Sequence, residues 1–162
     1  MTDLLNKISS YNLFNNLMPG ILFVILVKYF VGYNLEQENV FIGLFLYYFI
    51  GMTISRISSI AIEPLLKFSK IVTFRNYKLF IEASKKDEKL DILVETSNMF
   101  RVLFTMIFLT VLTKVYYSTQ GFWNLSETTE KYIMLGFLCL IYLLSYRKQT
   151  DFIKRRIDYN TK

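Results

Sequence analysis

The sequence predicts an all-α integral membrane protein with four transmembrane helices, a helical cytoplasmic loop and both termini in the cytoplasm. Its 162 residues are 53% hydrophobic, and the apolar residues are gathered into long runs separated by charged segments, which is typical of membrane proteins. The run 40–62 has 23 residues and one charge, enough to cross a bilayer as a helix. Lys and Arg are concentrated in alternate connecting segments, as the positive-inside rule requires.

The first predicted span covers about 17–33. Residues 1–16 have apolar side chains at helical spacing, so we expect a short amphipathic helix on the membrane surface. Pro19-Gly20 suits the first turn of a helix, where the missing N–H of proline has no partner to lose. A helix that starts at Leu13 and kinks at Pro19 is the alternative. We expect a retained anchor, because no small-residue cleavage site follows the apolar run.

The second predicted span, 40–62, carries a row of small residues spaced at multiples of four. The row consists of Gly43, Gly51, Ser55 and Ser59. In lipid, such a row lets two helix backbones approach closely. We therefore expect a helix-packing seam on this face and a homo-oligomeric protein. Glu63-Pro64 is expected to stop or kink the helix.

The segment 64–98 is the largest polar one and is the predicted cytoplasmic loop. Residues 76–98 contain no Gly or Pro and have apolar residues near helical spacing, which predicts a helix. One long helix from Asp87 through Thr113, entering the membrane near Met99, fits the same pattern.

The third and fourth predicted spans cover about 99–117 and 132–146. Gln120-Gly121 predicts a turn between them, and Ser126 with Glu130 in the next turn predicts the start of the fourth helix. A basic tail, 147–162, follows, with an apolar face expected to lie on a surface.

The distribution of Lys and Arg predicts the orientation. The first and third connecting segments hold only Lys131, whereas 14 positive residues are found in the N-terminus, the central segment and the tail. Because cytoplasmic segments carry this excess, we expect both termini and 64–98 to face the cytoplasm across a bacterial inner membrane.

Arg56 and Glu63 are the first candidates for a functional role. They are seven residues apart, so they share one face of the second helix. One interpretation is a charge pair that gates a pore or couples subunits. The other is an arginine that reaches lipid phosphates and a glutamate already outside the membrane.

The remaining candidates are lysines and arginines. Lys28 and Lys114 lie in the outer halves of their spans and either line an anion-selective pore or reach the outer headgroups. The other basic candidates are expected to contact lipid or a protein partner, or to form a solvated helix face. They are Lys85, Lys86, Lys89, Lys154, Arg155 and Arg156.

The composition argues against an enzyme. The chain has no histidine and no GxSxG motif, so the commonest general base and metal ligand is absent. The lone Cys139 forms neither a disulfide within the chain nor a CxxC site, and we expect it in the apolar core. We expect no cofactor, no metal and no direct contact with nucleic acid.

The stretch 11–20, YNLFNNLMPG, followed by an apolar run, resembles small bacterial membrane proteins that accompany anti-phage defence genes. These include membrane effectors of retron and cyclic-nucleotide systems and the membrane subunit of Kiwa-type systems. The resemblance covers 11–62 and carries over no functional residues.

The resemblance implies an oligomeric inner-membrane component of a defence system. It would be a pore-forming or membrane-disrupting effector, or a scaffold or sensor for a cytoplasmic protein that contacts 64–98 and the tail. A small channel, holin-like protein or transporter unrelated to defence is the alternative.

Overall fold

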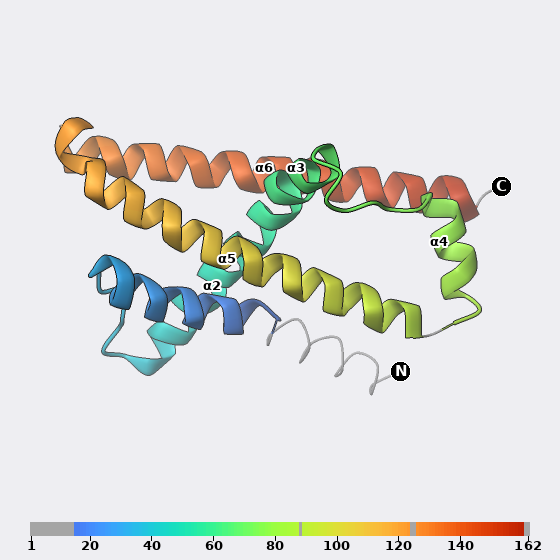
Figure 1. Cartoon of the computed structure of the whole chain (residues 1–162), viewed down its shortest axis with the longest axis horizontal. Helices are drawn as coiled ribbons and strands as arrows, with labels where there is room; N and C mark the ends of the chain where they lie inside the picture. The colour runs from blue at the N-terminus through green and yellow to red at the C-terminus, as the bar shows by residue number, and fades with distance from the viewer. Residues whose placement is uncertain (1–14, 88, 124–125, 161–162) are drawn as a thin grey trace.

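The computed structural model describes residues 15–87, 89–123 and 126–160, and these residues are helical apart from short connections (Figure 1). No strand occurs in this part of the chain. Three helices are long and apolar enough to cross a membrane, namely Val40–Phe68, Lys89–Thr119 and Glu127–Tyr159, and the apolar helix Asn15–Val31 is shorter. The all-α prediction is therefore confirmed.

The Asn15–Val31 helix covers most of the predicted span 17–33 and includes both Leu17 and Pro19. The alternative start at Leu13 and most of the predicted surface helix 1–16 lie outside the described residues. The last turn is a π-turn, η1 (Val27–Val31). It ends at Gly32, whose φ of 87° is left-handed and whose N–H donates to the carbonyls of Val27 and Lys28 at 3.1 and 3.2 Å.

Replacing Gly32 by alanine is expected to lower the free energy of unfolding by about 1 kcal/mol, because a Cβ disfavours the left-handed conformation. Thermal unfolding of the purified chain in detergent measures this loss. Gly136→Ala is the matched control, since a Cβ there meets nothing within 4 Å and alanine favours a helix. An unchanged Gly32→Ala variant would contradict the assignment of this residue as the helix cap.

The second long helix consists of α2 (Val40–Ile57), the π-turn η2 (Ser58–Ile62) and α3 (Glu63–Phe68). Asn39 caps its start, because its side-chain oxygen accepts from Phe41 N at 2.9 Å. Of the two outcomes predicted at Glu63-Pro64, a stop or a kink, the stop is wrong, because the helix continues to Phe68. The wide turn η2 directly precedes Pro64, and a π-turn relieves the clash between a proline ring and the preceding turn.

The predicted helix 76–98 is broken in the structure. Helix α4 covers Tyr77–Ser84 and α5 covers Lys89–Trp123. Asp87 accepts from the backbone N–H of Lys89 at 3.0 Å, which caps a new helix start. The long helix predicted to enter near Met99 is present as α5. The predicted turn at Gln120-Gly121 is wrong, because α5 continues to Trp123.

Helix α6 is continuous over Glu127–Asn160. Its predicted start is confirmed, since Ser126 Oγ accepts from the N–H of Thr129 at 3.2 Å. The tail 147–160 is not a separate surface segment but the second half of this helix. At 34 residues, α6 extends about 50 Å.

The helices pack around a small core formed by Ile54 of α2 with Val102 and Met106 of α5. The Asn15–Val31 helix covers this core with Leu22 and Phe23. Helix α6 packs against α2 and η2, and Glu130 near its start accepts from the Tyr116 hydroxyl of α5 at 2.8 Å. Much of its remaining surface is exposed, including Cys139. The expected burial of Cys139 is therefore wrong.

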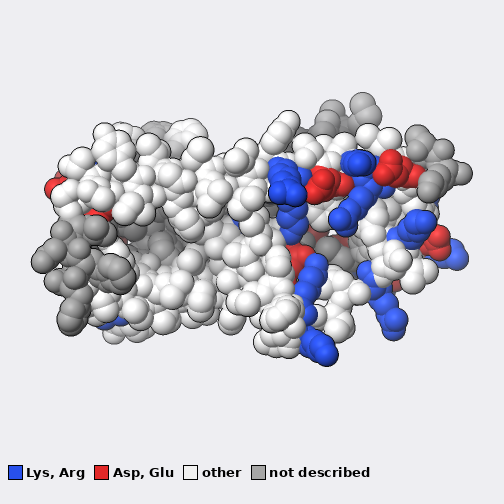
Figure 2. Space-filling model, turned by 90° about the horizontal axis from the view of Figure 1, so that it is seen from above, with Lys and Arg blue, Asp and Glu red and all other residues white. Residues whose placement is uncertain are grey.

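The molecule has a charged half and a half with few charged side chains, here called the apolar half, along its long axis (Figure 2). Charged side chains gather over the half that holds α4 and the C-terminal part of α6 (Figures 1 and 2). The other half shows few charged side chains on this face. Three long helices (α2 with α3, α5 and α6) meet where the halves join, and the candidate site lies there.

Candidate functional site at the helix crossing

Glu63 is the centre of a cluster of charged side chains at this crossing. Its carboxylate accepts from Arg101 Nη1 at 2.5 Å and from Lys67 Nζ at 2.6 Å. Lys148 Nζ of α6 lies 3.4 Å from the same carboxylate. One acidic side chain thus holds cations from α3, α5 and α6 together.

Two serines of η2 complete the cluster. Ser58 is fully buried, and its hydroxyl accepts from Arg101 Nε at 3.1 Å. Ser59 accepts from Lys148 Nζ twice, through its carbonyl at 2.6 Å and its hydroxyl at 2.8 Å. The π-turn therefore presents consecutive serines to two different helices, one to α5 and the next to α6.

Helix α6 is fixed to α2 by a second polar contact within the apolar half. The hydroxyls of Thr53 and Tyr142 lie 3.0 Å apart. The Tyr142 ring also stacks on Phe49, with 6.0 Å between ring centroids. With the Glu63 cluster, this contact holds the sparsely packed α6 at two levels.

The structure separates the predicted pair of Arg56 and Glu63. Glu63 forms its ion pairs with Lys67, Arg101 and Lys148. Arg56 is exposed and lines a cavity of about 30 Å³ between η2 and α6, together with Ser59, Lys148 and Gln149. Sequence spacing placed both residues on one helix but gave no information on the cations that approach from α5 and α6.

The small-residue row has its closest contact at Gly51. A Cβ on Gly51 would lie 1.6 Å from the carbonyl oxygen of Asn16, and one on Gly20 would lie 1.8 Å from that of Tyr47. The two glycines therefore let α2 and the Asn15–Val31 helix cross backbone to backbone. Gly51 of the predicted seam therefore packs against Gly20 of the same chain, a residue that the sequence marks only as part of a helix start.

The other row members have different surroundings. Gly43 is buried, and a Cβ there would meet only the Tyr47 side chain, at 3.4 Å. Ser59 contacts Lys148 of α6, and Ser55 is half-buried. The row thus faces at least two helices of the same chain rather than one.

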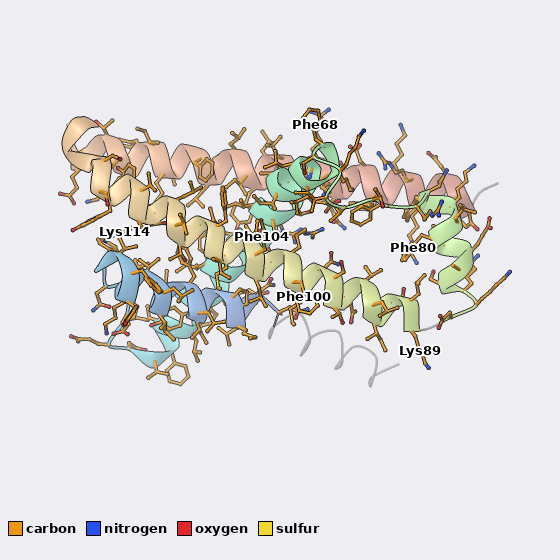
Figure 3. All side chains as sticks on the ribbon, viewed as in Figure 1. Phe68, Phe80, Lys89, Phe100, Phe104 and Lys114 are labelled. Carbon is orange, nitrogen blue, oxygen red and sulfur yellow. The ribbon has the colours of Figure 1, made fainter. Side chains whose placement is uncertain are left out.

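The two candidate pore lysines lie on neighbouring elements, since η1 packs against α5. Lys28 pairs with Glu36 at 2.5 Å, with both side chains about half exposed. Lys114 is exposed and lies toward the opposite end of α5 from Lys89 (Figure 3).

The remaining basic candidates lie on the charged half. Lys85 and Lys86 belong to the turn after α4, not to a helix face as expected, and Lys89 begins α5. The ammonium of Lys85 lies 5.4 Å from the centre of the Tyr159 ring, so the turn contacts the end of α6. The tail candidates are exposed on α6. They are Lys154, Arg155 and Arg156.

Arg101 and Lys148 are the functional candidates that sequence reasoning missed. Arg101 is a single cation within a predicted span, and Lys148 follows Arg147 directly after an apolar run. Both arrangements are also the pattern of an ordinary boundary residue. One available signal was their equal spacing, because Arg101 lies sixteen residues from Tyr117 and Lys148 lies sixteen residues from Tyr132, each at the far end of its apolar run.

The described residues include no cluster of His, Cys, Asp and Glu that would hold a metal ion. No protein-family model, no curated protein and no solved structure matches the chain.

Proposed function

We propose that the chain is a multi-pass protein of a bacterial inner membrane that anchors a charged helical platform for a cytoplasmic protein. The platform consists of α4, the turn 85–87, the first turns of α5 and residues 147–160 of α6. The Asn15–Val31 helix, α2, α5 and α6 are the four membrane helices, with both termini in the cytoplasm.

The length of α5 and α6 is the observation that carries this proposal. Helix α5 has 35 residues, which corresponds to about 52 Å, whereas the hydrocarbon of a bilayer is about 30 Å thick. About 20 Å of each helix therefore extends beyond the hydrocarbon, and the charged side chains gather on that same half (Figure 2). In the most apolar 18-residue stretch of each of the three long helices, only 17%, 22% and 6% of the residues are buried within the chain. The exposed apolar side chains are suited to contact with lipid.

The platform offers a surface suited to an acidic protein. Its tail carries adjacent exposed cations, Lys154, Arg155 and Arg156. Helix α4 packs against α5, and the contact of Lys85 with Tyr159 connects it to α6. Charge complementarity speeds encounter with a partner and selects against like-charged ones. We propose that this scaffold belongs to an anti-phage defence system, and the resemblance of residues 11–62 supports this part of the proposal.

Copurification from native cells tests the scaffold. We expect the full chain to retain a soluble protein that the double variant Lys154→Glu, Arg155→Glu loses, because charge reversal opposes an acidic partner. The control is Lys131→Glu at the other end of α6, where an exposed i,i+4 pair contributes little stability. Equal retention of the partner by both variants would contradict a tail-dependent platform.

The second candidate is a pore-forming effector in which Lys28 of η1 and Lys114 of α5, two elements that pack against each other, line the pore. It predicts depolarisation of the membrane when the chain is expressed, measured with a potential-sensitive dye. Depolarisation that Lys114→Gln weakens would support the pore and contradict a scaffold that acts alone.

A further inference from the structure

We propose that the cavity between η2 and α6 binds the phosphate group of an anionic lipid. This inference rests on the proposed membrane location of the chain but not on the platform or its partner. The polar side chains that line the cavity are Arg56, Ser59, Ser145, Lys148 and Gln149. Lys148 already donates to Ser59 and Glu63, whereas the side-chain donors of Arg56 and Gln149 have no partner among the described residues, so these two side chains are suited to an anion.

The charge around the cavity is unbalanced. Glu63 is shared by Lys67, Arg101 and Lys148, so one negative charge faces three positive charges. Arg56 adds a fourth positive charge, and within the described residues it forms no ion pair. Phosphate is the anion that a planar guanidinium binds through two parallel hydrogen bonds.

The depth of the cations along their helices matches a headgroup layer. Arg56 lies sixteen residues from Val40, Lys148 sixteen from Tyr132, and Arg101 sixteen from Tyr117. Each interval spans about 24 Å along a helix. If the far ends of these runs lie at one boundary of a hydrocarbon layer of about 30 Å, all three cations reach the opposite boundary, since Lys and Arg side chains extend toward headgroups.

The size of the cavity selects which part of the ligand enters. Its volume is about 30 Å³, room for about two water-sized groups. Phosphate oxygens fit this space, while the ester and the acyl chains remain outside. Ile60 and Phe152 line the cavity beside the polar groups and provide apolar contacts for the part of the lipid outside.

Native mass spectrometry of the full chain in detergent tests the site. Phosphatidylglycerol, phosphatidylcholine and inorganic phosphate are titrated separately, and the Kd of the first bound ligand is measured. We expect phosphatidylglycerol to bind more tightly than phosphatidylcholine, and Arg56→Gln to weaken it about tenfold through the loss of charge-assisted hydrogen bonds. Lys78→Gln removes an equal charge from exposed α4 and should leave the Kd unchanged.

Three results would overturn the assignment. Equal binding of both lipids would show contact with acyl chains alone, and equal weakening by Arg56→Gln and Lys78→Gln would show a general charge effect. Inorganic phosphate that competes with equal affinity would assign the cavity to a soluble phosphate compound. A chain that alkaline carbonate releases from membranes would instead contradict the proposed membrane location, so the two failures are distinguishable.

Discussion

Replacing Gly51 by alanine is expected to lower the free energy of unfolding by about 3 kcal/mol, at the upper end of the cost of overpacking. The new Cβ would lie 1.6 Å from the carbonyl oxygen of Asn16, and a backbone atom cannot move aside as a flexible side chain does. The two helices must separate, and the contacts of Leu22 and Phe23 with the core loosen. Gly20→Ala should have a similar effect from the other side of the crossing.

Gly43→Ala is the matched control, because it lies in the same row and its Cβ would be 3.4 Å from a side chain. Thermal unfolding in detergent, combined with cross-linking in membranes, measures both fold and assembly. A Gly51→Ala variant with unchanged stability would contradict the close crossing. A Gly51→Ala variant that keeps its fold but no longer forms oligomers would show that Gly51 packs between chains and not within one chain.

Replacing Glu63 by glutamine is expected to destabilise the chain by about 2–4 kcal/mol, because it leaves partly buried cations without their counter-ion. The side chains of Glu63, Arg101 and Lys148 are 14%, 19% and 29% exposed, so solvent screens the loss only in part. Helix α6 should detach first, since Lys148 would lose the one carboxylate with which it pairs among the described residues.

Glu36→Gln is the control for this second prediction. It removes the partner of Lys28 from an exposed pair, which is worth less than about 1 kcal/mol. Urea or thermal unfolding followed by circular dichroism compares the variants, and a double-mutant cycle of Glu63 with Arg101 isolates their interaction. An equal decrease in the free energy of unfolding for Glu63→Gln and Glu36→Gln would contradict the role of Glu63 in holding α3, α5 and α6 together.

The long helices were predictable from sequence because their signals are local. Apolar runs and the cap at Ser126 each depend on neighbouring residues. The break between α4 and α5 was missed because the sequence 76–98 contains no Gly or Pro to mark it. A stop at Pro64 and a turn at Gly121 were wrong because the helix continues through a π-turn before Pro64, and because a single glycine costs a helix only about 1 kcal/mol.

The candidate site was less predictable because its partners are distant in sequence. Glu63 is 38 residues from Arg101 and 85 from Lys148, and no periodicity reports such contacts. Gly20 was likewise noticed for its position after Pro19, whereas its close approach to Gly51 depends on how two helices cross.

The most direct test of the account is the side of the membrane on which each connection lies. In a Cys139→Ser background, single cysteines are introduced at Thr2, Glu38, Ala83 and Asp158 and labelled in spheroplasts with a membrane-impermeant maleimide. The account predicts that Glu38→Cys reacts in intact spheroplasts, whereas the other three react only after permeabilisation. Labelling of Ala83→Cys or Asp158→Cys from outside would contradict a cytoplasmic platform, and labelling of Thr2→Cys from outside would contradict four spans.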